Sequence, residues 1–138
     1  MFSLISGFYQ WFYQGVELRF LILGLDCAGK TTFLESLKGV FGQKHLDPNR
    51  VVPTIGLNTA NVRFGNFECS FWDVGGQTSL RKIWPKFYDG VCGIIFMVDS
   101  ADANRFSEIG AVLDQVLDSP KLANVPLIVL NKNILYFQ

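Results

Sequence analysis

The chain has 138 residues, of which 49% are hydrophobic and 17% charged, and its 12 basic side chains balance its 12 acidic ones. This length and composition predict one folded domain with an apolar core and exclude a disordered or low-complexity chain. The zero net charge argues against a nucleic-acid-binding protein, because such proteins carry an excess of Lys and Arg. Cys27, Cys69 and Cys92 lack metal-ligand spacing and are expected to be reduced thiols of a cytosolic protein.

The N-terminal segment, MFSLISGFYQWFYQ, carries no charged side chain. On a helix, its small and polar residues gather on one arc and its aromatic and aliphatic residues fill the rest, which predicts an amphipathic helical unit over residues 1–15 that ends at Gly15. Its Trp and Tyr residues are typical of helices at a membrane interface, and packing of the helix on the domain explains the pattern equally well. Phe2 at the second position excludes N-myristoylation.

The rest of the sequence predicts alternating strands and helices. Short apolar runs, and alternating residues around the turn Gly65-Asn66, predict strands at residues 18–23, 57–64, 67–73, 91–98 and 125–130. Apolar residues at helical spacing predict helices at residues 31–41 and 105–117. This order favours an α/β fold with a doubly wound, mostly parallel sheet, one antiparallel edge hairpin, and a ligand site at the carboxyl ends of the strands.

A complete phosphate-binding motif, G-x-x-x-x-G-K-[ST], lies between the first of these strands and the helix after it. The candidate binding residues are Gly24, Leu25, Asp26, Cys27, Ala28, Gly29, Lys30, Thr31 and Thr32. In such a loop, backbone N–H groups and the helix N-terminus surround a phosphate. We expect Lys30 to contact the β- and γ-phosphates and the Thr31 hydroxyl to bind Mg²⁺. A chance match is the alternative, and the position between strand and helix argues against it.

A second group of candidates flanks the hairpin. Asp73 ends its second strand and is followed by Gly76 and Gln77. We expect Asp73 to order Mg²⁺ through water, the Gly76 N–H to meet the γ-phosphate, and Gln77 to orient the attacking water as the catalytic residue. Thr54, before the hairpin, is expected to complete the Mg²⁺ shell. Taken alone, Asp73 also fits a turn aspartate and Gln77 a solvated surface residue.

Four further aromatic and basic side chains lie outside these motifs. Trp84, Phe87 and Tyr88 fit a core or an effector surface equally well, and Arg105 is expected to be a solvated helix residue.

Together these motifs resemble the Arf branch of small GTPases. The resemblance rests on GLDCAGKTTFL, PTIGLN, FWDVGGQ, VDSAD and the stretch Arg81-Lys82-Ile83-Trp84. With Phe2 where Arf proteins have the myristoylated glycine, the N-terminus is similar to that of the Arf-related subgroup, which works at the trans-Golgi. The resemblance implies a P-loop NTPase fold and a switch that binds GTP or GDP with Mg²⁺, held by Thr31 and Thr54, and hydrolyses GTP in membrane traffic.

The resemblance also implies partners and a location. These are an exchange factor, a GTPase-activating protein, effector proteins and no nucleic acid, for a cytoplasmic protein peripheral on Golgi membranes. The family's hairpin slides on GTP loading and expels the N-terminal helix toward a membrane, so the same movement is implied here.

The C-terminal sequence departs from the family pattern. Asn131 and Lys132 begin the guanine-reading motif N-K-x-D, but Asn133 and Ile134 follow without the aspartate. An ordinary strand-end turn explains Asn131 and Lys132 equally well. We therefore expect a truncated small GTPase domain over residues 16–132, without the family's last strand and helix, and a tag-like tail over residues 133–138. A non-enzymatic membrane or scaffold module and a P-loop kinase for a small metabolite are the alternative functions.

Overall fold

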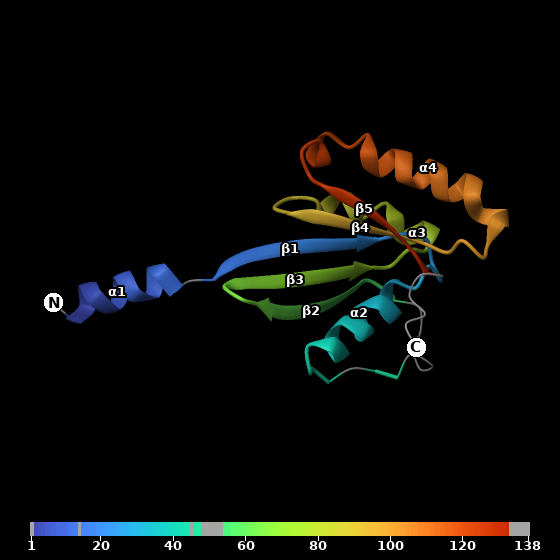
Figure 1. Ribbon diagram of the computed structural model, residues 1–138. Coiled ribbons are helices and arrows are strands. Elements are labelled where there is room, and N and C mark those ends of the chain that lie inside the picture. The colour runs from blue at the N-terminus through green and yellow to red at the C-terminus, as the bar shows by residue number, and fades with distance from the viewer. Residues whose placement is uncertain (1, 14, 45, 48–53, 133–138) are drawn as a thin grey trace.

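The computed structural model describes residues 2–13, 15–44, 46–47 and 54–132 (Figure 1). The strands are β1 (Val16–Leu23), β2 (Leu57–Phe64), β3 (Phe67–Val74), β4 (Gly93–Val98) and β5 (Leu127–Asn131). The α-helices are α1 (Phe2–Tyr13), α2 (Lys30–Val40), α3 (Thr78–Arg81) and α4 (Phe106–Leu117). Short 3-10 helices are η2 (Trp84–Phe87), η3 (Ala103–Arg105) and η4 (Pro120–Leu122).

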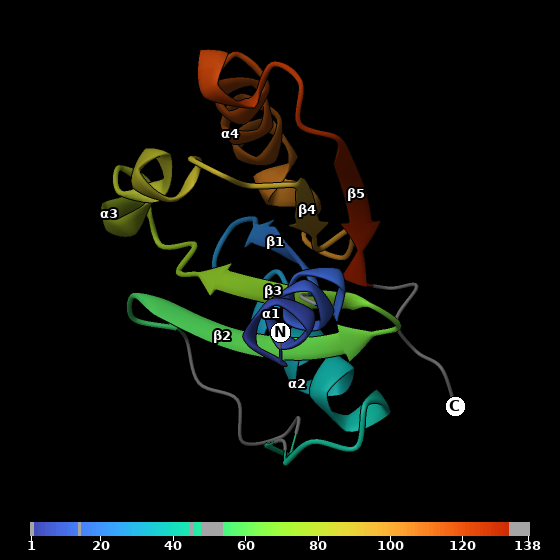
Figure 2. The ribbon, with the colours of Figure 1, turned by 90° about the vertical axis from the view of Figure 1, so that its left-hand side faces the viewer.

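The strands form one sheet in the order β2-β3-β1-β4-β5. The pairs β1–β3, β1–β4 and β4–β5 are parallel, whereas β2 runs antiparallel to β3 at the edge. In both views α2 covers one face of the sheet and α4 covers the other, with α3 on the α4 side (Figures 1 and 2). The predicted α/β fold with an antiparallel edge hairpin is therefore confirmed.

The alternation of side chains along β1 divides the core between the two faces. Leu21 and Leu23 belong to the apolar cluster that includes Val112 and Val116 of α4. Ile22, between them, belongs to the cluster that includes Leu34 of α2. Burial on both faces explains why residues 20–23, the second half of β1, form a continuous apolar run, as expected for an inner strand of a parallel sheet, whereas Glu17 and Arg19 lie in the more exposed first half.

Some element boundaries differ from those predicted. β1 begins at Val16 because its N–H donates to Asn66 O at 3.1 Å, which extends the pairing with β3 to the hairpin turn. β5 begins only at Leu127, after Pro126, whose carbonyl accepts a hydrogen bond from Ile94 N–H at 2.9 Å. The ring nitrogen of Pro126 has no N–H to donate to the sheet, which delays the start of the strand.

The helix predicted at the N-terminus is present as α1. It continues beyond the amino end of β1 and lies over neither face of the sheet (Figures 1 and 2). Leu4, Ile5 and Phe8 are 78%, 63% and 64% exposed. In the described part of the chain, no helix has the length and apolar character needed to cross a membrane.

Candidate functional site

The predicted phosphate loop joins β1 to α2 at the carboxyl edge of the sheet. Its backbone takes positive φ at Gly24 (143°), Cys27 (61°) and Gly29 (90°). A Cβ at Gly24 would lie 2.3 Å from Met97 O of β4, so only glycine fits this close approach between strand ends. Positive φ at Cys27 is uncommon for a residue with a side chain and shows how tightly the loop turns.

Lys30 begins α2 and folds back into this loop. It is buried, and its Nζ donates to Gly24 O at 3.0 Å and to Leu25 O at 2.7 Å. Burial lowers the pKa of the Lys30 ammonium, and the charges of Asp73 and Asp26 oppose that shift. A bound phosphate would provide this buried cation with a stronger partner than two neutral carbonyl groups.

Thr31, Thr54 and Asp73 meet beside the loop, although they come from separate parts of the chain. The Thr31 hydroxyl donates to Asp73 Oδ2 at 2.5 Å, and its Oγ1 lies 2.6 Å from Thr54 Oγ1. Thr54 Oγ1 lies 3.1 Å from the same carboxylate oxygen. The sheet brings these groups together because α2 follows β1, Asp73 lies near the end of the neighbouring strand β3, and Thr54 lies just before β2.

This oxygen cluster fits a magnesium ion. Asp73 is fully buried, and its Oδ1 has no hydrogen-bond partner among the described residues. A buried carboxylate oxygen without a partner is costly, and a cation with its water ligands would satisfy it. Hydroxyl and carboxylate oxygens are the hard ligands that Mg²⁺ prefers. The described residues contain no group of three His, Cys, Asp or Glu side chains able to hold a metal, so further ligands would come from phosphate and water.

Gly76 packs directly against the phosphate loop. A Cβ at Gly76 would lie 2.3 Å from Gly24 O and 2.6 Å from Asp26 N, so a side chain would push the two segments apart. Gln77 follows as a half-buried residue at the N-cap position of α3, and its side chain makes no capping hydrogen bond there. Trp84 stabilises the position of the segment 75–77, because its indole N–H donates to Gly75 O at 3.0 Å. Trp84 and Tyr88 are buried, so the core explanation holds for both.

Arg105, expected to be a solvated helix residue, instead forms ion pairs beside the phosphate loop. Its Nη2 lies 2.7 Å from Asp26 Oδ1 in the phosphate loop, and its Nε lies 3.0 Å from Glu108 Oε2. The hydrogen bond from Arg105 to Asp26 holds the pKa of the Asp26 carboxyl below its ordinary range. Arg105 and Asp26 are 79 residues apart in the sequence. No local pattern links them, and only the packing of η3 against the loop does.

Lys132 also reaches the phosphate loop. Its Nζ donates to Cys27 O at 3.4 Å and lies 3.1 Å from Asp99 Oδ2. Because β5 pairs with β4 so that Asn131 is opposite Val98, the residue after β5 arrives beside the loop. The structure thus brings Lys132 to the candidate site. Asn133 and Ile134, where the guanine-reading motif departs from the family pattern, lie outside the described residues.

Comparison with known proteins identifies the family. Residues 4–135 match the sequence profile of the ADP-ribosylation factor family. The chain belongs to this family. It is 42% identical over 132 residues to "ADP-ribosylation factor-related protein 1" of Mus musculus and 40% identical over 131 residues to "ADP-ribosylation factor-like protein 3" of Saccharomyces cerevisiae. Each alignment covers 94% of this chain and 66% of the relative, so the chain spans just under two thirds of these proteins.

A solved structure of the same fold carries a nucleotide analogue. The Arl6 BBS3 small GTPase from Trypanosoma brucei, with bound GppNp, matches with a TM-score of 0.70 and 26% sequence identity. The match covers 83% of this chain and 66% of that one. The P-loop NTPase fold expected from the resemblance to Arf proteins is thereby confirmed.

Glu35 is a buried residue of this ADP-ribosylation factor family domain that sequence reasoning missed. It is 2% exposed on α2, its Oε1 accepts from Lys38 Nζ at 2.7 Å, and its Oε2 accepts from Leu46 N–H at 2.7 Å. Burial would raise the pKa of Glu35, but hydrogen bonds from Lys38, Leu46 and Asn58 outweigh it and hold the pKa below its ordinary range. Glu35 therefore ties α2 to the segment after it and to β2.

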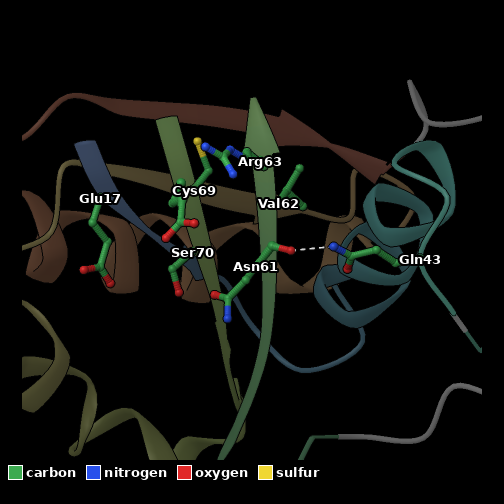
Figure 3. A pocket seen from close by; sticks show the side chains of 8 residues that line it. Glu17, Gln43, Asn61, Val62, Arg63, Cys69 and Ser70 are labelled. Carbon is green, nitrogen blue, oxygen red and sulfur yellow. Dashed lines mark hydrogen bonds between the residues drawn. The ribbon is translucent and has the colours of Figure 1, made fainter. Parts of the chain in front are cut away.

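The domain has a polar cavity of about 350 Å³ away from the candidate site (Figure 3). It lies at the amino ends of β1 and β3, and Gln43 Nε2 donates to Asn61 O at 2.5 Å beside it. The lining residues are Glu17, Gln43, Asn61, Val62, Arg63, Glu68, Cys69 and Ser70. None of the predicted site residues borders this cavity.

Proposed function

We propose that this protein is a regulatory switch that binds GTP or GDP with Mg²⁺ and hydrolyses GTP. The observation that carries the proposal is the meeting of Thr31, Thr54 and Asp73 beside the buried Lys30. Thr54 precedes β2 and Asp73 lies near the end of β3, so both lie at the open end of the β2–β3 hairpin, and ligands at the loop would act on both of its strands. Binding can therefore be coupled to the position of the hairpin, which a switch requires.

The residues of the site have distinct roles in the proposed reaction. Lys30 would exchange its bonds to loop carbonyls for phosphate oxygens, and the hydroxyls of Thr31 and Thr54 would hold the metal ion with Asp73 behind them. When bound, Mg²⁺ supplies positive charge that offsets the charge of the phosphates. Gln77 would orient the water that attacks the γ-phosphate.

The side chains of Arg81 and Arg105, beside the loop, are already paired with carboxylates. Arg81 Nη2 lies 2.8 Å from Glu108 Oε1, and Arg105 is paired with Asp26 and Glu108. An arginine that stabilises the charge of the transferred phosphoryl group accelerates such reactions about 10³–10⁵-fold. We therefore infer slow intrinsic hydrolysis that a GTPase-activating protein accelerates. The resemblance to Arf proteins also implies an exchange factor that assists nucleotide release.

The membrane part of the proposal rests on α1. Leu4, Ile5 and Phe8 are exposed, and an apolar helical surface without charges favours a lipid interface or an apolar protein groove. The N-terminal sequence resembles that of the Arf-related subgroup, which works at the trans-Golgi, and this resemblance supports a role in Golgi membrane traffic with effector proteins. The proposed location is the cytoplasmic surface of Golgi membranes.

Nucleotide titration tests the proposal directly. Fluorescent GDP and a non-hydrolysable GTP analogue are titrated with the chain in Mg²⁺ and again in EDTA. The parent chain should bind both nucleotides more tightly in Mg²⁺, and Thr31→Val should remove that advantage because it keeps the shape and loses the hydroxyl. Ser36→Ala is the matched control, since Ser36 is an exposed residue of α2 whose hydroxyl donates to Thr32 O at 2.9 Å. Absence of nucleotide binding by the parent would favour the non-enzymatic membrane or scaffold module.

A further inference from the structure

The phosphate loop contains an acidic residue whose charge opposes its proposed function. Asp26 is the third residue of a loop whose backbone N–H groups and lysine favour an anion. A carboxylate at this position repels phosphate, and the repulsion is stronger in a partly buried site than in bulk water. The Asp26 charge acts on Lys30, whose pKa it raises against the effect of burial.

The Arg105 guanidinium contacts both the carboxylate and the backbone carbonyl of Asp26. Nη2 of Arg105 lies 2.7 Å from Asp26 Oδ1, and Nη1 donates to Asp26 O at 3.3 Å. Arg81 Nη2 is 3.8 Å from the same carboxylate oxygen. The side chains of Asp26, Arg105 and Arg81 are 35%, 27% and 12% exposed, so solvent screens these charges only in part.

Glu108 of α4 completes a network of four charges. It accepts hydrogen bonds from Arg81 Nη2 at 2.8 Å and from Arg105 Nε at 3.0 Å. Arg81 Nε in turn donates to Gly76 O at 2.8 Å. The network of Asp26, Arg81, Arg105 and Glu108 therefore has no net charge and connects the phosphate loop, the segment after β3 and α4.

We propose that Arg105, assisted by Arg81, neutralises Asp26 and directs its carboxylate toward α4, so that the phosphate loop keeps its affinity for a triphosphate. Arg105 is thus a positioning residue that acts on the anion through Asp26. The inference rests on the proposed function in one respect, which is that the anion belongs to a nucleotide.

The charge arithmetic predicts opposite effects for two members of the network. Loss of the Arg105 charge leaves the network with a net negative charge beside the loop, which should weaken triphosphate binding. Loss of the Glu108 charge leaves a net positive charge, which should preserve or strengthen it. A merely structural tie between the loop and α4 would weaken binding in both variants, so the sign separates the two explanations.

The experiment measures binding by calorimetry with three probes: GppNHp with Mg²⁺, GDP with Mg²⁺, and inorganic tripolyphosphate. Arg105→Gln should weaken binding of GppNHp about tenfold, which equals about 1.4 kcal/mol, and weaken binding of GDP less. Adding Asp26→Asn should restore the affinity to within about twofold, because the uncompensated charge is gone. Arg105→Lys keeps the charge and should retain most of the affinity. Glu108→Gln should bind GppNHp at least as tightly as the parent chain.

Lys121→Gln is the matched control, because Lys121 pairs with Asp89 at 3.0 Å on the surface and its loss changes the net charge equally. Circular dichroism establishes that each variant is folded. Equal weakening by Arg105→Gln and Glu108→Gln, without rescue by Asp26→Asn, would overturn the inference. If tripolyphosphate follows the expected pattern but GppNHp binds no more tightly than tripolyphosphate, the nucleotide function fails and the role of Arg105 stands. If none of the probes binds the parent chain, both are wrong.

Discussion

Replacement of Glu35 by Gln tests how α2 is tied to the segment that leads toward Thr54. The carboxylate is 2% exposed and accepts two hydrogen bonds of 2.7 Å, from Lys38 Nζ and from Leu46 N–H. Hydrogen bonds to a charged group contribute about 1.5–3 kcal/mol each, and Gln keeps one acceptor oxygen while losing the charge. We expect Glu35→Gln to lower the free energy of unfolding by about 2–3 kcal/mol.

The effect of Glu35 should depend on pH in a defined direction. Because the folded-state pKa of Glu35 lies below its ordinary range, its stabilisation is complete above the pKa of the unfolded chain. It is lost as the pH falls through the folded-state pKa. The stability difference between the parent chain and Glu35→Gln should therefore be constant near neutral pH and shrink in acid.

Urea unfolding, followed by circular dichroism over a series of pH values, measures this difference. Asp114→Asn is the control, since it removes one negative charge from an exposed position on α4 and should change stability by less than about 0.5 kcal/mol. A Glu35→Gln effect as small as that of the control, or one that stays the same in acid, would refute the reasoning.

Three further predictions concern the proposed switch. Lys30→Ala should weaken nucleotide binding by about 2–5 kcal/mol, because it removes a charge-assisted contact, and affinity within a few-fold of the parent in a titration would contradict the assignment. Gln77→Leu should abolish hydrolysis stimulated by an activating protein while GTP affinity persists, and unchanged single-turnover hydrolysis would count against its role. The chain should sediment with liposomes when loaded with a GTP analogue and much less with GDP. Replacing Leu4 and Phe8 by Ala should remove that difference, whereas equal sedimentation of the parent in both states would show that α1 does not switch.

The features predicted from the sequence are those encoded by neighbouring residues. The phosphate loop was recognisable because its glycines, Lys30 and Thr31 form one uninterrupted motif between a strand and a helix. The β2–β3 hairpin followed from the Gly65-Asn66 turn between alternating residues, and α1 from the helical spacing of its apolar residues. In each case the backbone conformation depends on contacts within a few residues, so periodicity and turn chemistry were sufficient.

The features that only the tertiary structure decided join residues that are distant in the chain. Arg105 meets Asp26 across 79 residues, and Lys132 reaches the loop because β5 lies beside β4 in the order β2-β3-β1-β4-β5. Glu35 is buried and accepts a hydrogen bond from Leu46 N–H, 11 residues further along the chain. Charged residues such as Arg105 and Glu35 look like solvated surface residues in a sequence, since hydropathy patterns carry no information about their partners. Their roles depend on which strand ends and helices the packing of the sheet brings together.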